Sequence, residues 1–463
     1  MECLVVKLIK SWNNTVGNVN TTDEILNWIE ELNRTTYVEI KECSIYDSKF
    51  WFYDDYNGEV LNLKRSFFSI TGMRYFENNK FVKEQPVIIQ PEIGYLGIIC
   101  KEIDGELNFL MQAKIEPGNV NCVQISPTIQ ATKSNFTRVH GGNLPAYFEY
   151  FENSNKYEIL FDQIQSEQAS RFYKKRNRNI IIKINDDIEV LNNFCWMTLG
   201  QIKALMKIDN LVNMDTRTVI SGIPFIFNNL STKEKNLIRN IMNNDPLYYS
   251  IFNTDFMVDL HSLYNNINDY KMFNEIKVSK VPLNELVDWN INEYGITCTK
   301  NSDFMVRYYD ISISGREVQN WTQPLFKANG KALFCLVYKV IDNKMKFLVS
   351  LKPEIGSFDK VELGPTLQVE STEIFKVDNV INEFIYKKIE NYDNIILDVI
   401  LSEEGGRFYH EQNRNIILEA KNDELENIPK GYHWVDYSVL NYLIQINNCL
   451  NIQLRNLISL IDL

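Results

Sequence analysis

The sequence predicts an α+β protein made of two similar domains, each a curved mixed sheet with flanking helices, related by internal duplication and a pseudo-two-fold axis. Three observations support this. Residues 402–418, SEEGGRFYHEQNRNIIL, closely repeat residues 166–182, SEQASRFYKKRNRNIII. Residues 323–368 align without a gap on residues 85–130. Both copies show the same order of strand-like and helix-like apolar patterns. A repeat of this length is a duplicated domain rather than a solenoid unit.

A β-hairpin is predicted near the start of each aligned copy. In residues 95–115, two apolar-rich runs flank Asp104-Gly105, and residues 332–353 repeat this pattern around Asp342-Asn343. Dipeptides of this kind occupy the tight turns that join antiparallel strands. Further strands are expected at residues 123–130, 178–184, 361–368 and 414–420.

Helices are predicted to flank these strands. Residues 21–33 place apolar residues at helical spacing, and either Thr22 or Asp23 is a suitable N-cap. Residues 282–291 begin with Pro282, which suits the first position of a short helix. Other helices are expected at residues 143–151, 198–208, 380–389 and 437–446.

The repeat also predicts the domain boundaries. The first copy, with its N-terminal helices, is expected at residues 1–223, and the second copy at residues 271–463. Residues 224–270 are polar and helix-like, so we expect a helical connection between the two domains.

The composition excludes several functions. A net charge of −12 argues against broad nucleic-acid binding, because phosphate contacts need a basic surface, although one local basic pocket remains compatible with it. The eight cysteines are scattered singly without a CxxC pair, which indicates reduced thiols and a cytoplasmic protein. No run approaches about 18 apolar residues, so no membrane span is expected. The N-terminal region carries no signal-peptide pattern.

Common catalytic motifs are missing from the sequence. It contains no GxGxxG loop after a strand, no Walker loop, no HExxH and no GxSxG. Its four histidines are dispersed, so a histidine-rich metal site is not expected. Catalysis is therefore expected to depend on carboxylate, Tyr, His and Lys side chains, without a metal or a bound redox cofactor.

The repeated string combines Ser-Glu, Arg-Phe-Tyr and Asn-Arg-Asn at the entry to a strand. Such donors suit phosphate, carboxylate or sugar hydroxyl groups. The alternative is structural: Arg171 or Arg178 would pair with Glu167 and brace a loop, and Arg407 or Arg414 would do the same in the second copy. Both interpretations stay open, because a feature shared by both copies is easily a requirement of the fold.

The differences between the copies are more informative. Tyr409, His410 and Glu411 offer proton-transfer groups, whereas the first copy has the cationic run 173–176. Upstream, the second copy carries three acidic side chains and the first copy keeps one of them. The aligned pairs are Glu354/Glu116, Asp359/Asn121 and Glu362/Gln124. The second copy is thus the candidate for chemistry, although a solvated charged face would explain these acids equally well.

One segment of the first copy, residues 133–145, has no counterpart in the second. Its polar residues alternate around Phe136, and two following glycines permit close approach to the backbone. This pattern suits a nucleobase or a diphosphate, and a surface turn is the alternative. Trp51 and Trp321 are aromatic platforms of the kind that pack against sugars or bases, or else simple core residues.

At these strings the sequence resembles the nucleotide-sugar 2,3-dehydratases of deoxysugar biosynthesis. The resemblance covers nearly the whole chain. The segments that carry it are residues 112–142, 166–179, 210–218, 361–368 and 402–415. It implies a homodimer in which each subunit holds two Nudix-like domains. The Nudix metal-binding box is found in neither copy, which indicates a fold used without its hydrolase chemistry.

The resemblance also implies a substrate, dTDP-4-keto-6-deoxyglucose, and no cofactor. Water would be eliminated after removal of the C3 proton, and a downstream 3-ketoreductase would act on the product. Residues of the first copy that would contact the substrate are Trp51, Ser134, Asn135, Phe136, Thr137, Arg138 and His140. In the second copy they are Trp321, Thr322, Gln323, Lys352, Arg407, Glu411 and Arg414.

We expect proton transfer to be carried by Glu362, Tyr409 and His410, without assigning base and acid among them. Arg407, Lys352 or Tyr409 would stabilise the enolate oxygen. Two other functions remain open. One is a catalytically silent module that binds a nucleotide sugar, and the other is a Nudix-type pyrophosphohydrolase, which the missing box disfavours.

Overall fold

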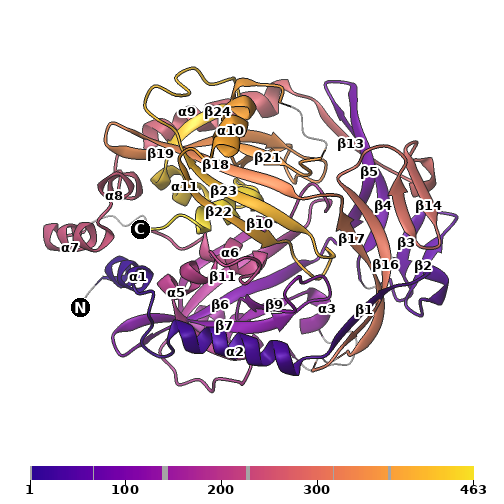
Figure 1. Cartoon of the computed structure of the whole chain (residues 1–463), viewed down its shortest axis with the longest axis horizontal. Coiled ribbons are helices and arrows are strands. Elements are labelled where there is room, and N and C mark those ends of the chain that lie inside the picture. Colours follow the sequence, from indigo (N-terminus) through magenta and orange to yellow (C-terminus); the bar gives the residue numbers. More distant parts are fainter. Residues whose placement is uncertain (1–2, 66, 138–143, 226–229, 316–317, 374–376) are drawn as a thin grey trace.

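The structure is a computed structural model. The residues that it describes are 3–65, 67–137, 144–225, 230–315, 318–373 and 377–463. Within them the chain forms two large sheets and two small sheets, with helices packed around them (Figure 1). The predicted α+β class and the duplicated two-domain layout are confirmed.

Each half contributes one large mixed sheet. In the first, strands run in the order β10-β11-β6-β7-β12, with β8 on β7 and β9 on β6. Their bounds are β6 (Ile93–Ile103), β7 (Glu106–Ile115), β8 (Val123–Ser126), β9 (Ile129–Ala131), β10 (Glu158–Ser166), β11 (Arg176–Ile184) and β12 (Phe194–Thr198). The β11–β6 pair is parallel and the other pairs are antiparallel.

The second large sheet repeats this topology. Its bounds are β18 (Ala332–Ile341), β19 (Lys344–Pro353), β20 (Val361–Gly364), β21 (Leu367–Val369), β22 (Ile395–Ser402), β23 (Gln412–Glu419) and β24 (Tyr432–Asp436). Strands β18 and β23 are parallel, matching β6 and β11. The two halves therefore share a fold as well as a sequence pattern.

Both predicted hairpins are confirmed. Asp104 and Gly105 have φ values of 51° and 82°, and Asp342 and Asn343 have φ values of 49° and 59°. Positive φ at both central residues matches the right-handed twist of the flanking strands, and Asp, Asn and Gly tolerate it best.

The predicted strand at residues 123–130 is broken in two, as is its counterpart. β8 pairs with β7, and after Pro127 the chain crosses to pair with β6 as β9. Thr128 stabilises this crossing, because its Oγ1 accepts from Ile99 N at 2.9 Å and donates to Leu110 O. Apolar patterning alone does not reveal such a change of partner strand.

The two small sheets exchange strands between the halves. One contains first-half strands and β13 (Ile276–Val281), which pairs with β4. The other contains second-half strands and β1 (Val38–Glu42), which pairs with β16. Their remaining strands are β2 (Trp51–Asp54), β3 (Glu59–Asn62), β4 (Ser69–Glu77), β5 (Lys80–Ile89), β14 (Trp289–Asn292), β15 (Gly295–Cys298), β16 (Phe304–Ile313) and β17 (Asn320–Ala328). Figure 1 shows both small sheets on the same side of the molecule.

The repeated strings meet where the halves contact each other. Gly118 N donates to Gly405 O at 2.7 Å, and Gly356 N donates to Ala169 O at 2.8 Å. A Cβ at Gly118 would lie only 1.6 Å from Phe408 O, so no side chain fits there. The first half contacts the second half through Gly118 as the second half contacts the first through Gly356. This reciprocity indicates a pseudo-two-fold relation between the halves.

Helices cover the outer faces of the large sheets and fill the space between the halves. Their bounds are α1 (Leu4–Asn13), α2 (Thr22–Thr35), α3 (Lys133–Phe136), α4 (Phe148–Glu152), α5 (Leu199–Leu205), α6 (Met214–Ile220), α7 (Thr232–Met242), α8 (Asp245–Ile251), α9 (Met257–Phe273), α10 (Val380–Asn391), α11 (Tyr437–Leu443) and α12 (Ile452–Ser459). Helices α6 and α12 pack against each other, and one apolar core includes buried residues of both halves. None of the described helices has the length and apolarity needed to span a bilayer.

Helix α8 occupies in the second half the place of α1 in the first. Ser11 Oγ donates to Leu107 O at 2.6 Å on β7, and Ser250 Oγ donates to Met345 O at 2.5 Å on β19. Part of the segment expected to connect the domains thus repeats the N-terminal helices of the first half.

Two helix predictions need correction. The N-cap of α2 is Thr21, because its hydroxyl accepts from Glu24 N while the Glu24 carboxylate accepts from Thr21 N, a reciprocal pair that Thr22 and Asp23 do not form. The short helix predicted at residues 282–291 is a single 3₁₀ turn, Leu283–Glu285, followed by β14. Pairing of β14 with β15 outweighs the local helical preference.

Candidate functional site

Two cavities among the described residues lie in different halves of the chain. The first cavity has a volume of about 660 Å³ and the second a volume of about 730 Å³. Both are within the usual size range of small-molecule sites, about 300–1,000 Å³. Their linings differ in chemistry, and this difference separates their roles.

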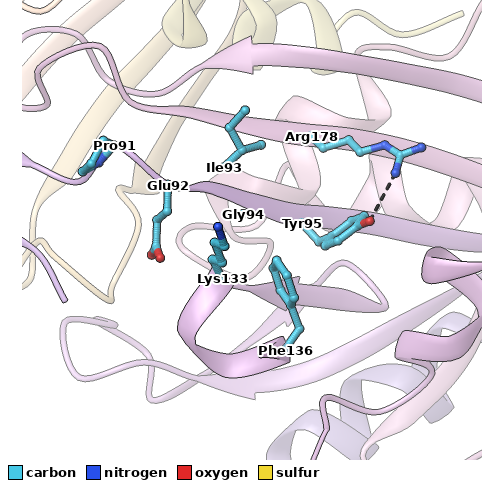
Figure 2. Close-up of a pocket in the computed structure, with 8 residues that line it drawn as sticks. All are labelled: Pro91, Glu92, Ile93, Gly94, Tyr95, Lys133, Phe136 and Arg178. Carbon is cyan, nitrogen blue, oxygen red and sulfur yellow. Dashed lines mark hydrogen bonds between the residues drawn. The ribbon is translucent and has the colours of Figure 1, made fainter. Parts of the chain in front are cut away.

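The first cavity is aromatic and cationic (Figure 2). Its lining is Pro91, Glu92, Ile93, Gly94, Tyr95, Lys133, Phe136 and Arg178. The rings of Tyr95 and Phe136 lie 5.4 Å apart, and Arg178 Nη1 donates to Tyr95 OH at 3.2 Å. Asp162 accepts from Arg178 Nη2 at 2.6 Å and fixes the guanidinium. Rings beside cations suit a base and a phosphate.

Of the segment predicted to contact substrate here, Phe136 lines the cavity. The polar residues around it stabilise α3: Ser134 Oγ is 2.9 Å from Thr132 Oγ1, Asn135 Oδ1 accepts from Thr132 N at 3.2 Å, and Thr137 Oγ1 donates to Lys133 O at 2.7 Å. Arg138 and His140 lie outside the described residues.

The second cavity is rich in titratable groups of both signs. Its lining is Lys83, Asp303, Ser350, Leu351, Lys352, Pro353, Thr366, Leu367, Gln368, Val369, Glu370, Ser371, Asp378, Asn379, Asn382, Lys430, Gly431 and Tyr432. All but one of these residues belong to the second half. The exception is Lys83 on β5, a strand of the first half. A side chain of the first half therefore completes the lining of this cavity.

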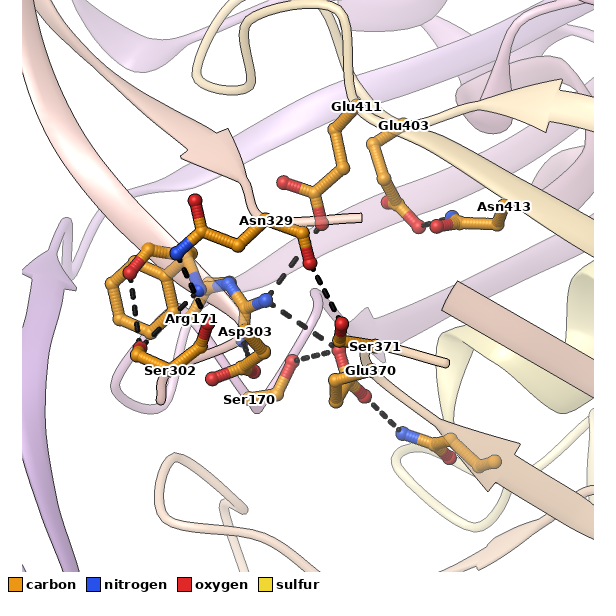
Figure 3. A network of polar contacts seen from close by, with 12 residues as sticks. Ser170, Arg171, Ser302, Asp303, Asn329, Glu370, Ser371, Glu403, Glu411 and Asn413 are labelled. Carbon is orange, nitrogen blue, oxygen red and sulfur yellow. Dashed lines mark hydrogen bonds and ion pairs between the residues drawn. The ribbon is translucent and has the colours of Figure 1, made fainter. Parts of the chain in front are cut away.

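An arginine of the first half lies beside two carboxylates of this cavity, Asp303 and Glu370, and beside Glu411 (Figure 3). Arg171 is fully buried, and its Nη1 lies 2.9 Å from Asp303 Oδ2. Its Nη2 lies 3.7 Å from Glu370 Oε2 and 3.8 Å from Glu411 Oε1. The guanidinium also stacks over the ring of Phe304, 4.3 Å from the centroid. One cation thus positions three carboxylates in a region of low dielectric, where such interactions are strong.

The charges of these groups follow from burial and from each other. Burial raises the pKa of Glu411 to about 7, although Arg171 acts against this shift. Burial also favours a higher pKa for Asp303, but Arg171 and Lys83 together hold it below its usual value. Desolvation lowers the pKa of Lys83, opposed by the carboxylates of Asp303, Glu370 and Glu354. The cavity therefore contains an acid, Asp303, whose pKa is held low, and a lysine, Lys83, whose pKa is lowered, and Glu411 beside Arg171 has a raised pKa.

Glu370 is the glutamate among the residues that line the second cavity. It follows β21 and lines the second cavity, with 18% of its side chain exposed. Ser170 Oγ donates to it at 3.2 Å and Gln368 Nε2 donates at 2.9 Å, which fixes its orientation. In the alignment of the two copies, its counterpart is Thr132, which cannot act as a base.

Of the three side chains predicted to transfer protons, Tyr409 and His410 stack on each other, and Glu362 makes a separate contact. Glu362 is buried between the halves, where Ser166 Oγ donates to it at 2.6 Å. Tyr409 stacks on Tyr309 at 4.3 Å and on His410 at 4.1 Å. None of Glu362, Tyr409 and His410 is among the described residues that line either cavity.

The contact of Glu362 has a neutral counterpart in the other half. Gln124 Nε2 donates to Ser402 Oγ at 2.7 Å, just as Ser166 contacts Glu362. Burial raises the pKa of Glu362 to about 8. An amide therefore fills the same position in the first half, which supports a structural role for this side chain.

Glu362→Gln is expected to change the pH dependence of stability. The folded protein keeps this carboxyl protonated up to about pH 8, whereas the unfolded chain releases the proton near its ordinary pKa of about 4.3. The free energy of unfolding of the wild type should then fall between these pH values by up to about 1.4 kcal/mol per pH unit. The variant lacks this loss, so urea unfolding should show its relative stability rising from pH 6 to pH 8. Parallel curves for the two proteins would contradict this.

The other predicted contacts are divided between the halves. Lys352 lines the second cavity, and Glu411 lies beside Arg171. Arg407 lies in the first half, over the rings of Phe67 and Phe68, and its Nη2 donates to Gln90 Oε1 at 3.2 Å. Trp51 is buried and packs against the same two rings. Arg171 of the first half thus lies among second-half residues, and Arg407 of the second half lies among first-half residues.

Three predicted contacts lie near the small sheets. Trp321 Nε1 donates to Gln323 Oε1 at 3.1 Å, and Gln323 Nε2 donates to Gly406 O at 2.5 Å. Thr322 Oγ1 is 2.5 Å from Ser48 Oγ. These contacts join strand β17 to residues 402–418, the second copy of the repeated string, and to Ser48 of the first half. None of the three residues is among those that line either cavity.

The structural alternative, in which arginines of the strings pair with Glu167 and Glu403, is wrong in its partners. Arg178 pairs with Asp162 and Arg414 pairs with Asp398, each at 2.6 Å across neighbouring strands, while Arg171 pairs with Asp303. The glutamates take amide partners instead: Asn177 donates to Glu167 at 2.6 Å, and Asn413 donates to Glu403. The antiparallel register sets these cross-strand partners, and sequence proximity does not.

Sequence reasoning missed Lys83, Asp303 and Glu370. For two of them the sequence held a signal, a charged residue in one copy that is uncharged in the other. Glu370 aligns with Thr132, and Lys83 aligns with Trp321, when the gap-free alignment of the copies is extended to them. The same comparison had singled out residues 409–411. Among the described residues, no group of three or more His, Cys, Asp or Glu side chains is arranged to hold a metal ion.

Comparison with known proteins assigns the family. A family model described as NDP-hexose 2,3-dehydratase matches residues 22–223 and, a second time, residues 260–461. The chain belongs to the NDP-hexose 2,3-dehydratase family. Both halves of this 2,3-dehydratase family member are thus matched by the same model, which agrees with the duplicated fold.

Three curated relatives carry the name dTDP-4-dehydro-6-deoxy-alpha-D-glucopyranose 2,3-dehydratase. The protein of Saccharopolyspora spinosa is 35% identical over 420 residues, 88% of this chain and 85% of the relative. That of Streptomyces violaceoruber is 32% identical over 93% of this chain and 95% of the relative. That of Amycolatopsis orientalis is 32% identical over 97% of this chain and 92% of the relative. The similarity therefore extends over both halves.

Proposed function

We propose that this protein is a sugar-nucleotide 2,3-dehydratase that converts dTDP-4-keto-6-deoxyglucose into a dTDP-3,4-diketo-2,6-dideoxyhexose. The observation that carries the proposal is the full-length similarity to relatives named for this 2,3-dehydration. The second cavity supports it, because carboxylates, lysines and a tyrosine line one cavity.

The reaction needs an acid and a base but no redox partner. The C4 ketone acidifies the C3 hydrogen, and a base removes it to leave an enolate. The enolate re-forms the ketone while a C2–C3 double bond forms and the C2 hydroxyl leaves with a proton from an acid, as water. The resulting enol tautomerises to the 3,4-diketone. Each positioned acid or base contributes about 10²–10⁴-fold in rate.

We assign the chemistry to the second cavity, with Glu370 as the base. Arg171, Ser170 and Gln368 hold its carboxylate in one orientation. Tyr432 also lines the cavity, and burial together with Asp378 raises its pKa, so its phenol stays protonated and can donate toward the leaving hydroxyl. The first cavity, with Phe136, suits the role of nucleotide cradle.

Several finer features of the family resemblance also enter the proposal. Each half would be a Nudix-like domain, and the protein would act as a cytoplasmic homodimer. A downstream 3-ketoreductase would consume the unstable diketone. The domains would extend over residues 1–223 and 271–463, joined by residues 224–270. Light scattering of the purified protein tests the dimer.

The activity is tested by incubating the protein with dTDP-4-keto-6-deoxyglucose, with and without a 3-ketoreductase, and following the mass of the sugar nucleotide. We expect loss of one water, trapped as the reduced product when the reductase is present. Binding without loss of water would indicate a silent binding module. Release of dTMP with a Mg²⁺ requirement would indicate a pyrophosphohydrolase, and either result would refute the proposal.

A further inference from the structure

Lys83 reaches the second cavity from the opposite half of the chain. It lies on β5, in the small sheet that includes β13 of the second half, and it lines the cavity together with Asp303 and Glu370. Among the described residues, its ammonium group has no hydrogen-bond or ion-pair partner. Lys352, in the same cavity, donates to Gln368 O at 3.3 Å. The donors of Lys83 are therefore available to a ligand.

Burial lowers the pKa of Lys83, and the repulsion of Arg171 acts in the same direction, so the charged form depends on the carboxylates around it. Asp303, Glu370 and Glu354 all act to keep it protonated, against desolvation and the repulsion of Arg171. Two of these carboxylates are already oriented by other donors, since Asp303 is paired with Arg171 at 2.9 Å and Glu354 accepts from Gln368 at 3.0 Å. Lys83 is thus a half-buried cation whose neighbours are oriented without it.

The duplication provides an internal comparison. Lys83 aligns with Trp321 and Glu370 aligns with Thr132, so the first half lacks both the cation and the carboxylate at the equivalent positions. Lys352, by contrast, aligns with Lys114, and each donates to the carbonyl of its aligned glutamine, at 3.3 Å and 3.0 Å. A shared lysine is thus a feature of the fold, whereas Lys83 and Glu370 occur together in one cavity alone.

We propose that Lys83 is a catalytic residue that the first half contributes to the second cavity, where its ammonium group hydrogen-bonds the C4 oxygen of the substrate. When the base takes the C3 proton, the C–H electron pair becomes the C3–C4 π bond and the carbonyl oxygen gains negative charge. A cation placed at this oxygen stabilises the developing charge more than it stabilises the ketone. Lys83 itself transfers no proton in this step. The inference rests on the proposed dehydration.

The test measures C3 deuterium incorporation in D₂O and loss of water for the full-length protein and its variants. Lys83→Met should lower both rates by about 10²–10³-fold, the usual effect of removing one donor to an oxyanion. Lys80→Met, in the same strand and exposed, is the matched control and should behave as wild type. Thermal unfolding of Lys83→Met shows whether the fold is intact.

Chemical rescue separates a cation from a base. Added primary amines should partly restore exchange in Lys83→Met in proportion to the ammonium form, and Lys83→Arg should retain more activity than Lys83→Met. Rescue that follows the neutral amine would make Lys83 the base and overturn the proposal. Unchanged exchange in Lys83→Met would overturn it too, as would failure of both arginine and amines to restore it. A wild-type protein without dehydration would instead refute the proposed function.

Discussion

Glu370→Gln is expected to lower the rates of C3 deuterium exchange and of water loss by about 10³–10⁴-fold, the upper part of the range for a general base. The amide keeps the size of the side chain and can still accept a hydrogen bond from Ser170 or Gln368, so binding should change little. The loss should therefore appear in kcat. Proton NMR in D₂O measures the exchange directly, without the elimination step.

The control for this substitution is Glu373→Gln, an exposed glutamate three residues further along the chain, which should leave both rates unchanged. The same assay discriminates the candidates proposed from sequence. If Glu370→Gln exchanges as fast as wild type while Glu362→Gln, Tyr409→Phe or His410→Gln does not, the base is one of those side chains and the second cavity does not carry the proton abstraction.

Arg171→Met is expected to destabilise the fold by about 3–5 kcal/mol, the usual cost of removing one partner from a buried ion pair. The substitution leaves Asp303, Glu370 and Glu411 without the cation that lies 2.9–3.8 Å from them. Activity should fall as well, because the carboxylate of Glu370 loses part of its orientation. Urea unfolding measures the loss of stability.

The destabilisation by Arg171→Met should depend on pH. Burial raises the pKa of Glu411 to about 7 even with Arg171 present, and the pKa rises further when the cation is removed. Below its raised pKa, Glu411 of the folded variant holds a proton, and the variant avoids a buried charge. The loss of unfolding free energy relative to wild type should therefore be smaller at pH 6 than at pH 8. Arg239→Met, which removes an exposed pair with Asp245, should have little effect at either pH. Equal deficits at both pH values would contradict this account.

The roles of the two strings depend on their crossing between halves. Arg171 belongs to the first string but organises carboxylates of the second half, and Arg407 belongs to the second string but lies among Phe67, Phe68 and Gln90 of the first half. In the sequence, each arginine was assigned to its own copy. The glycines Gly118 and Gly356 allow the strings to approach closely enough for this exchange.

Local patterns in the sequence were sufficient for much of the fold. Alternating apolar runs around Asp104-Gly105 and Asp342-Asn343 specify hairpins, because turn chemistry and strand periodicity act over a few residues. Similarity between the two copies alone identified the duplication. The family resemblance based on the same segments agrees with the family model, which matches both copies. Two of the residues predicted to contact substrate, Phe136 and Lys352, line cavities in separate halves.

Only the tertiary structure decided which half completes which cavity. Periodicity reports which face of a strand is buried, but it does not report which sheet edge a strand joins, and β1 and β13 join the sheets of the opposite halves. That choice places Lys83 and Arg171 beside Glu370, residues far apart in the chain. It depends on contacts between distant segments whose free energies add up only in the packed state, so no local pattern in the sequence records it.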